Sequence, residues 1–268
     1  MMNEQIRKAC ALDQPQLHHL WETVFRDPPD LVQAFFDRFP PEISGWVLSQ
    51  GETICSAAYL ILGNWYIHQS QMRPAAYVYA VATKPSFRGR GYAGMLMQAI
   101  SEYAQDRNLL LYTRPAEQSL FPWYSSKMKA DNIGHLKHFH YTSLDRAQKL
   151  PVRSLTPTDY GALREANLSG LPHLVMSESF LRLQEIYSDG FYAVGDGCCC
   201  VIKEEDKLQI PELLISDTLK EAAVQTLLKH FKAIDAIVRF VGTGSDIPGV
   251  AYAGAALPEQ TNWGLFLE

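Results

Sequence analysis

The sequence lacks the features that carry a chain into or across a membrane. It has no run of about 18 apolar residues, and no basic start leads into the short apolar segment of a signal peptide. We therefore expect a soluble, cytoplasmic protein without a membrane partner. Apolar residues still make up 47% of the 268 residues, which is enough for one large core or two smaller ones.

Cysteine is scarce, and its placement argues against disulfides and against a metal. There are five cysteines, and an odd number in a chain without a secretion signal favours reduced thiols. Cys198, Cys199 and Cys200 are consecutive and lack the spacing of zinc ligands, so we predict small, buried residues of a strand. His138 and His140 would share one face of a strand, without an evident third ligand. We predict no metal site.

An excess of positive charge is also missing. The formal net charge is -5 at pH 7. Nucleic-acid binding rests largely on neutralising phosphates with lysine and arginine, so we expect no nucleic-acid partner. The charge is compatible with a cationic amine as a substrate.

The most informative stretch covers residues 77–100. Residues 77–82 have the apolar, β-branched pattern of a buried strand, and apolar residues at helical spacing begin at residue 93. Between them, residues 88–91 form the glycine-rich turn Arg-Gly-Arg-Gly. At the start of a helix, glycines let the backbone approach an anion, and free N–H groups point at it. With its two arginines, this turn predicts a phosphate-binding loop.

Two common phosphate motifs do not fit this loop. The Walker A motif needs Lys-Ser/Thr after its last glycine, where this chain has Tyr92-Ala93, and the dinucleotide fingerprint needs a third glycine. The pattern that fits is Arg-x-x-Gly-x-Ala at Arg88, Gly91 and Ala93. Here the sequence resembles the GNAT superfamily of N-acetyltransferases, whose acyl-CoA pyrophosphate loop has this form. Residues 20–39 also resemble a bacterial, two-domain branch of that family.

The resemblance implies an α+β fold, with two GNAT-like domains in tandem. Each would have a mixed, mostly antiparallel sheet flanked by helices. Residues 1–147 would be the catalytic, acetyl-CoA-binding domain, closed by a strand around residues 134–140. Residues 151–268 would be a degenerate copy, because this half repeats the order of helix and strands but has no glycine loop after its strand at 208–215. A separate α+β domain remains an alternative, and the glycine-containing residues 241–245 are predicted as loop.

The resemblance also implies the chemistry, which is direct transfer of an acetyl group from acetyl-CoA to a primary amine of a small molecule or peptide. Tyr124 falls where many members of the family carry a tyrosine that protonates the leaving thiolate, although it could instead be a packed core tyrosine. A strand N–H near Val81 would polarise the thioester carbonyl. The residues implied to bind acetyl-CoA are Val81, Ala82, Thr83, Arg88, Gly89, Arg90, Gly91, Tyr92 and Ala93.

Several questions stay open at this level. The group that accepts the proton of the amine could be Glu117, Tyr79, Glu268 or a chain of water molecules. The acceptor could be an aminoglycoside, a polyamine, an amino acid or a protein N-terminus, and the oligomeric state is undetermined. An alternative function is a non-catalytic CoA-binding or regulatory module whose C-terminal domain is an interaction surface.

Overall fold

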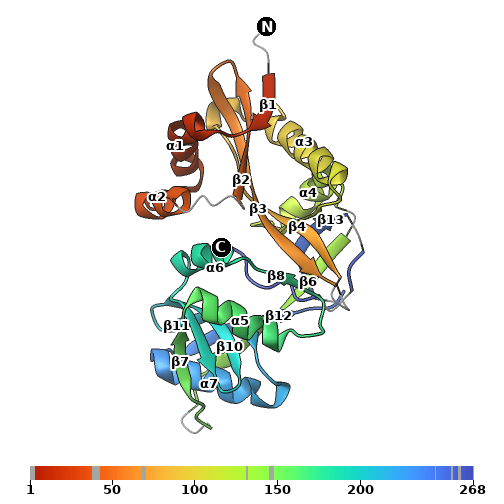
Figure 1. Ribbon diagram of the computed structural model, residues 1–268. Helices are drawn as coiled ribbons and strands as arrows, with labels where there is room; N and C mark the ends of the chain where they lie inside the picture. Colours follow the sequence, from red (N-terminus) through yellow and green to blue (C-terminus); the bar gives the residue numbers. More distant parts are fainter. Residues whose placement is uncertain are drawn as a thin grey trace. The chain divides into compact units, whose positions relative to one another are not determined.

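The computed structural model describes residues 4–37, 43–67, 71–130, 132–144, 148–244, 246–254, 256–258 and 261–267. The chain divides into two compact units, which are described separately below (Figure 1). Unit 1 comprises Met1–Trp65, Arg73–Ile133 and Gly249–Ala256, and unit 2 comprises Tyr66–Met72, Gly134–Pro248 and Leu257–Glu268. Each unit has a mixed, mostly antiparallel sheet flanked by helices, as the sequence predicts. No helix in the described ranges is long and apolar enough to cross a membrane.

Unit 1 has two helices after its first strand, then antiparallel strands, a helix after the glycine turn, and a further strand and helix. Its elements are β1 (Glu4–Lys8), α1 (Gln14–Phe25), α2 (Pro29–Asp37), β2 (Ile43–Gln50), β3 (Thr53–Tyr66), β4 (Met72–Thr83), α3 (Tyr92–Asp106), β5 (Leu110–Thr113) and α4 (Phe121–Met128). The helical spacing of Leu96, Met97 and Ile100 places all three in the core, where α3 packs on the sheet. The strands β4 and β5 are parallel, whereas β1 pairs with β2, and β2 with β3, antiparallel.

Unit 2 repeats this plan. Its elements are β7 (Val152–Leu155), α5 (Pro157–Asn167), β8 (His173–Val175), α6 (Glu178–Ile186), β9 (Phe191–Val194), β10 (Gly197–Glu204), β11 (Lys207–Leu214), α7 (Lys220–Phe231) and β12 (Asp235–Val241). The strands β11 and β12 are parallel, like β4 and β5. Thr156 caps α5 by accepting a hydrogen bond from the Asp159 backbone N–H at 3.1 Å, as its capping sequence predicts. The consecutive cysteines 198–200 are fully buried in β10, which confirms that prediction.

Two strands differ from the sequence-based prediction, because each belongs to the unit built mainly from the other half of the chain. β6 (Asn132–Thr142), predicted to close the first domain, pairs antiparallel with β12 of unit 2, from Leu136↔Val241 to Thr142↔Asp235. β13 (Ile247–Ala253), which was not predicted from the sequence, pairs antiparallel with β5 of unit 1. Pro248 and Gly249 have low strand propensity, so the sequence does not indicate a strand here. Both lie at the start of β13, where they are tolerated, and the apolar residues that follow are buried. The compact units therefore do not coincide with the predicted ranges 1–147 and 151–268.

An ion pair next to β1 makes the stability of unit 1 sensitive to acid. Arg7 donates from Nη1 to Asp13 Oδ2 at 2.6 Å and from Nη2 to Oδ1 at 2.8 Å, and Asp13 is buried. The hydrogen bonds from Arg7 lower the pKa of Asp13 to about 2. A carboxyl group whose pKa is lower in the folded than in the unfolded chain stabilises the fold. The stabilisation is complete at pH values above the unfolded-state pKa of about 4, and it is lost as the pH falls towards the folded-state pKa.

We therefore expect Arg7→Leu to lower the urea midpoint of unfolding at neutral pH and to have a much smaller effect near pH 2. The matched control is Arg73→Leu, because Arg73 donates to the uncharged Asn108 side chain at 2.6 Å. Its effect should not change across this pH range. Equal effects of Arg7→Leu at both pH values would contradict the assignment.

Candidate functional site

Two glycines set the shape of the turn that leads into α3. Gly89 has φ 78° and Gly91, which caps α3, has φ 79°. A Cβ atom at either position would meet nothing within 4 Å, so the left-handed backbone, rather than crowding, requires glycine. The first N–H groups of α3 have no acceptor within the helix, as at any helix start. The turn therefore offers backbone donors next to open space.

Two arginines are held beside this turn. Arg88 is exposed, and its Nε donates to the carbonyl oxygen of Thr83 at 3.2 Å. Arg90 is also exposed, donates from Nη2 to Ser86 O at 3.4 Å, and lies 5.0 Å from the centre of the Phe87 ring. Both guanidinium groups thus lie at the start of α3, where the helix dipole also favours negative charge.

The next two predicted residues have different surroundings. The side chain of Tyr92 is buried, and its hydroxyl accepts a hydrogen bond from Gln50 Nε2 at 2.9 Å. Its ring packs against the turn through Phe87. Only the backbone of Tyr92 is available to a ligand, whereas Ala93 is half-buried in the first turn of α3.

The strand before the turn carries an irregularity that the sequence does not reveal. Ala80, inside β4, has φ 49°, a conformation that residues other than glycine seldom adopt. Among the described residues, the parallel ladder between β4 and β5 ends at Tyr77↔Tyr112, just before this position. Such irregularities bend a strand and are common next to functional sites. Beyond Ala80, β4 has backbone groups that are not paired with β5.

The direction of these backbone groups follows from the contacts on the other side of β4. Lys84 donates its backbone N–H to Cys55 O of β3 at 2.9 Å, and Ala82 O accepts from Ser56 Oγ at 2.7 Å. Because backbone groups alternate in direction along a strand, the N–H groups of Val81 and Thr83 point away from β3. The Val81 N–H is therefore directed to the side on which β5 lies.

Tyr124 lies in α4 near the end of β5. Its ring is half-buried and packs edge-on against Trp123, with 4.8 Å between the ring centres. Burial raises the pKa of Tyr124, and a hydrogen bond with the Thr113 side chain opposes this shift. Thr113 in turn donates to Val78 O of β4 at 2.9 Å. One threonine thus connects the tyrosine hydroxyl with β4, just before Ala80.

The three candidates for the proton acceptor differ in their surroundings. Tyr79 belongs to an aromatic cluster, with its ring 5.8 Å from that of Trp21 and 6.0 Å from that of Phe35. Glu117 is exposed and accepts a hydrogen bond from Ser119 at 3.1 Å. Glu268 lies outside the described residues.

Comparison with known proteins shows which family the first half of the chain is similar to. Residues 5–127 match the family model of an acetyltransferase domain, the GNAT domain. This part of the chain is similar to a GNAT acetyltransferase domain. The match covers β1 to α4 and includes the glycine turn, β4 and Tyr124. No curated protein matched this sequence in a search for relatives.

Solved structures show that the fold likeness extends over both units. A probable N-acyltransferase from Enterococcus faecalis V583 aligns with a TM-score of 0.74 at 12% identity, covering 93% of this chain and 72% of that one. A GCN5-related N-acetyltransferase from Anabaena variabilis aligns with a TM-score of 0.68 at 17% identity, covering 93% and 72%. A tandem GNAT protein from the clavulanic acid biosynthesis pathway aligns with a TM-score of 0.57 at 13% identity, covering 94% and 98%. At these identities the likeness concerns the fold alone.

Some residues around the candidate site were absent from the sequence-based prediction. Ala80 and Thr113 were missed because an alanine and a threonine in apolar strands carry no signal of their own. Ser56, which bonds Ala82 O and lies 3.0 Å from the Thr83 hydroxyl, was also missed. In contrast, the glycine spacing marked the turn directly.

Proposed function

We propose that the protein is an N-acetyltransferase, which moves an acetyl group from acetyl-CoA directly to a primary amine of a small-molecule or peptide acceptor. One observation carries this proposal. The two left-handed glycines and two arginines at the start of α3 follow directly on the part of β4 that is unpaired with β5. An anion-binding turn that directly follows a strand with backbone groups unpaired with β5 suits a ligand with a pyrophosphate at one end and an amide-bearing arm at the other.

The residues of the turn and of β4 fit acetyl-CoA. The backbone N–H groups of residues 89–93 and the side chains of Arg88 and Arg90 would hold the pyrophosphate. The strand groups of residues 81–83 would bond the pantetheine amides. When bound, acetyl-CoA supplies an acetyl group activated as a thioester. We infer no metal, and the proposal requires none.

The chain's own groups then have distinct tasks. The Val81 N–H, directed away from β3, would donate to the thioester oxygen as negative charge develops there. Tyr124 keeps its proton at neutral pH, because burial raises the pKa of the phenol, and it would donate this proton to the leaving sulfur. Thr113 positions the Tyr124 hydroxyl. The acceptor enters as a neutral amine, and the group that takes its proton stays open between Glu117, Tyr79, Glu268 and water.

The pyrophosphate turn is tested by calorimetric titration of acetyl-CoA into the purified protein. Arg88→Ala removes a charge-assisted contact worth about 1.5–3 kcal/mol, so its dissociation constant should rise roughly tenfold to a hundredfold. Gly91→Ala places a side chain on a backbone with φ 79° and should also weaken binding.

A matched variant separates the role of the turn from backbone strain. Gly170 in unit 2 has the same φ of 79° and the same open surroundings as Gly91. Gly170→Ala should therefore impose similar strain but leave acetyl-CoA affinity unchanged. If both Arg88→Ala and Gly91→Ala bound acetyl-CoA with wild-type affinity, the turn would not be part of the binding site. If Gly170→Ala weakened binding as much as these two variants, the effect would reflect lower protein stability.

A further inference from the structure

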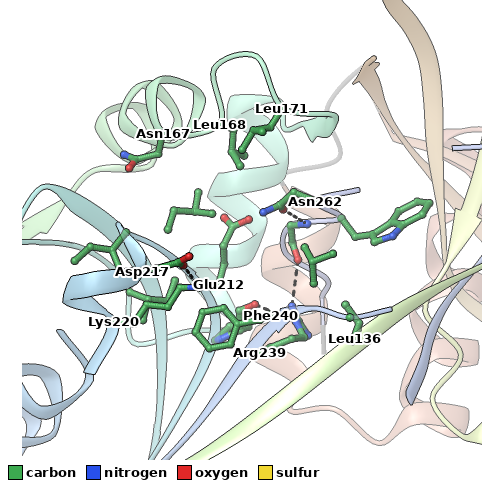
Figure 2. Close-up of a pocket in the computed structure, with 18 of the residues that line it drawn as sticks. Leu136, Asn167, Leu168, Leu171, Glu212, Asp217, Lys220, Arg239, Phe240 and Asn262 are labelled. Atoms are coloured by element: carbon green, nitrogen blue, oxygen red, sulfur yellow. Dashed lines mark hydrogen bonds and ion pairs between the residues drawn. The ribbon is translucent and has the colours of Figure 1, made fainter. Parts of the chain in front are cut away.

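A cavity of about 740 Å³ lies within unit 2, beside the carboxyl ends of the parallel strands β11 and β12 (Figure 2). Small-molecule sites typically have volumes of about 300–1,000 Å³. The walls include the residues after α5, the start of α7, and residues 262–264 near the end of the chain. This cavity has no part in the acetyl transfer proposed for unit 1.

The cavity begins where the ladder between β11 and β12 ends. The two strands pair from Lys207↔Asp235 to Ile210↔Val238. The next residue of β11 is Pro211, which has no N–H to donate. Its carbonyl accepts instead from Arg239 Nε at 3.0 Å, and Arg239 Nη2 also donates to Gly264 O at 3.3 Å. The Arg239 side chain thus bonds the Pro211 carbonyl in place of a backbone N–H of β12. Beyond this point the described residues of the two strands are no longer paired, and the cavity lies next to them.

The two cations of the wall are already engaged with protein groups. Lys220 Nζ lies 2.6 Å from Asp217 Oδ1 and 4.6 Å from the centre of the Phe240 ring. Arg239 is held by the two backbone carbonyls and lies 5.0 Å from the centre of the Phe266 ring. A ligand anion would therefore have to displace existing contacts of these side chains.

One carboxylate of the wall, that of Glu212, in contrast has an oxygen without a partner in the described part of the chain. Glu212 is 4% exposed, and its Oε2 accepts from the Tyr160 hydroxyl and from Arg164 Nε at 2.9 Å. Its Oε1 is buried and has no hydrogen-bond partner among the described residues. A buried acceptor without a donor is costly and calls for a partner. Asp196, an exposed residue of the wall, adds a second carboxylate.

The remaining wall combines apolar residues with polar ones, such as Asn167, Ser216 and Asn262. Leu168 and Leu171 follow α5, and Figure 2 shows both on the side of the cavity opposite Arg239. Leu168 is buried, whereas Leu171 is 54% exposed. Phe240 contributes an aromatic ring from β12. An unpartnered carboxylate oxygen next to apolar side chains suits a ligand that has a hydrogen-bond donor attached to an apolar group.

We propose that this cavity binds a small primary amine, with its ammonium group bonded to Glu212 and its apolar body against Leu168, Leu171 and Phe240. Arg164 offsets part of the charge of Glu212, and Asp196 supplies further negative charge for the ammonium. Unit 2 would then be a ligand-binding domain rather than a second transferase, in keeping with the missing glycine turn between β11 and α7.

The proposal is tested by titrating phenethylamine into the full chain and measuring the heat. The amine should bind, whereas 3-phenylpropionate, which has a similar body and the opposite charge, should not. Glu212→Gln removes a charged acceptor and should weaken binding at least about tenfold. Leu171→Trp fills the cavity from an exposed position and should weaken it by a similar factor. Glu185→Gln, on the exposed face of α6, is the control and should leave binding unchanged.

Leu171→Trp keeps the test valid if Glu212→Gln, which leaves Arg164 without its buried partner, fails to fold. Weakening by Leu171→Trp and not by Glu185→Gln supports the site. If neither Leu171→Trp nor Glu185→Gln weakened the binding of phenethylamine, the amine would bind elsewhere, for example in unit 1, and the proposal would be wrong. The absence of binding to the wild-type chain, or equal binding of 3-phenylpropionate, would also overturn it.

Discussion

Replacing Tyr124 by phenylalanine should lower kcat by about 10²-fold, at the low end of the range for general acid catalysis. The phenol lies beside Thr113, and burial raises its pKa, so it is protonated throughout the neutral range. Phenylalanine keeps the ring that packs on Trp123 but removes the proton donor. Acetyl-CoA affinity, measured by calorimetry, should stay unchanged, because the hydroxyl acts on the leaving sulfur and not on the pyrophosphate.

The control for this experiment is Tyr103→Phe. Tyr103 lies in α3 of the same unit, and its hydroxyl accepts a hydrogen bond from Lys8 at 3.1 Å. Loss of that exposed contact should leave kcat unchanged. If Tyr124→Phe had the same kcat as the wild type while chemistry limits the rate, Tyr124 would be a packing residue.

The second large effect concerns β13, the strand that unit 1 receives from the C-terminal part of the chain. A fragment of residues 1–130 should be less stable than the same fragment joined by a Gly/Ser linker to residues 247–256. Ala251 of β13 is fully buried in the core cluster of unit 1, Ala253 packs against that cluster, and the strand pairs with β5. The buried alanine surface and the ladder hydrogen bonds should therefore raise the unfolding free energy by about 1–3 kcal/mol.

Urea unfolding followed by tryptophan fluorescence measures this difference. Without β13, one edge of β5 is unpaired, so the shorter fragment should also tend to aggregate. A linked fragment with Ala251→Asp, which places a charge at a fully buried position, provides a matched negative control. Equal midpoints for the short and the linked fragment would show that β13 does not stabilise unit 1.

The sequence predicts most helices and strands of both units because their apolar residues recur at regular spacing, but α6 and β8 of unit 2 were not predicted. The turn at residues 88–91 was also predictable, because left-handed backbone at Gly89 and Gly91 demands glycine. In contrast, the partners of β6 and β13 depend on long-range pairing. A strand with an apolar pattern, such as β6, fits the sheet edge of either unit, and the sequence alone contains no information on which edge it joins.

The details of the candidate site were less accessible. The φ of Ala80 is imposed by tertiary structure on a residue with no local preference for it. Thr113 acquires its role only because β5 runs parallel to β4. The cavity of unit 2 depends on Pro211, where the ladder between β11 and β12 stops, and on Arg239 and Glu212, which are far apart in the sequence.

The central claim, that the chain transfers acetyl groups to amines, is tested most directly by following thiol release from acetyl-CoA in the presence of single amines. The series should include aminoglycosides, polyamines, amino acids and short peptides. We expect at least one class to accelerate thiol release by the wild-type chain, and this acceleration should be largely lost in Arg88→Ala at subsaturating acetyl-CoA but retained in Gly170→Ala. Firm binding of acetyl-CoA without amine-dependent thiol release for any class would contradict the claim and favour a non-catalytic CoA-binding module.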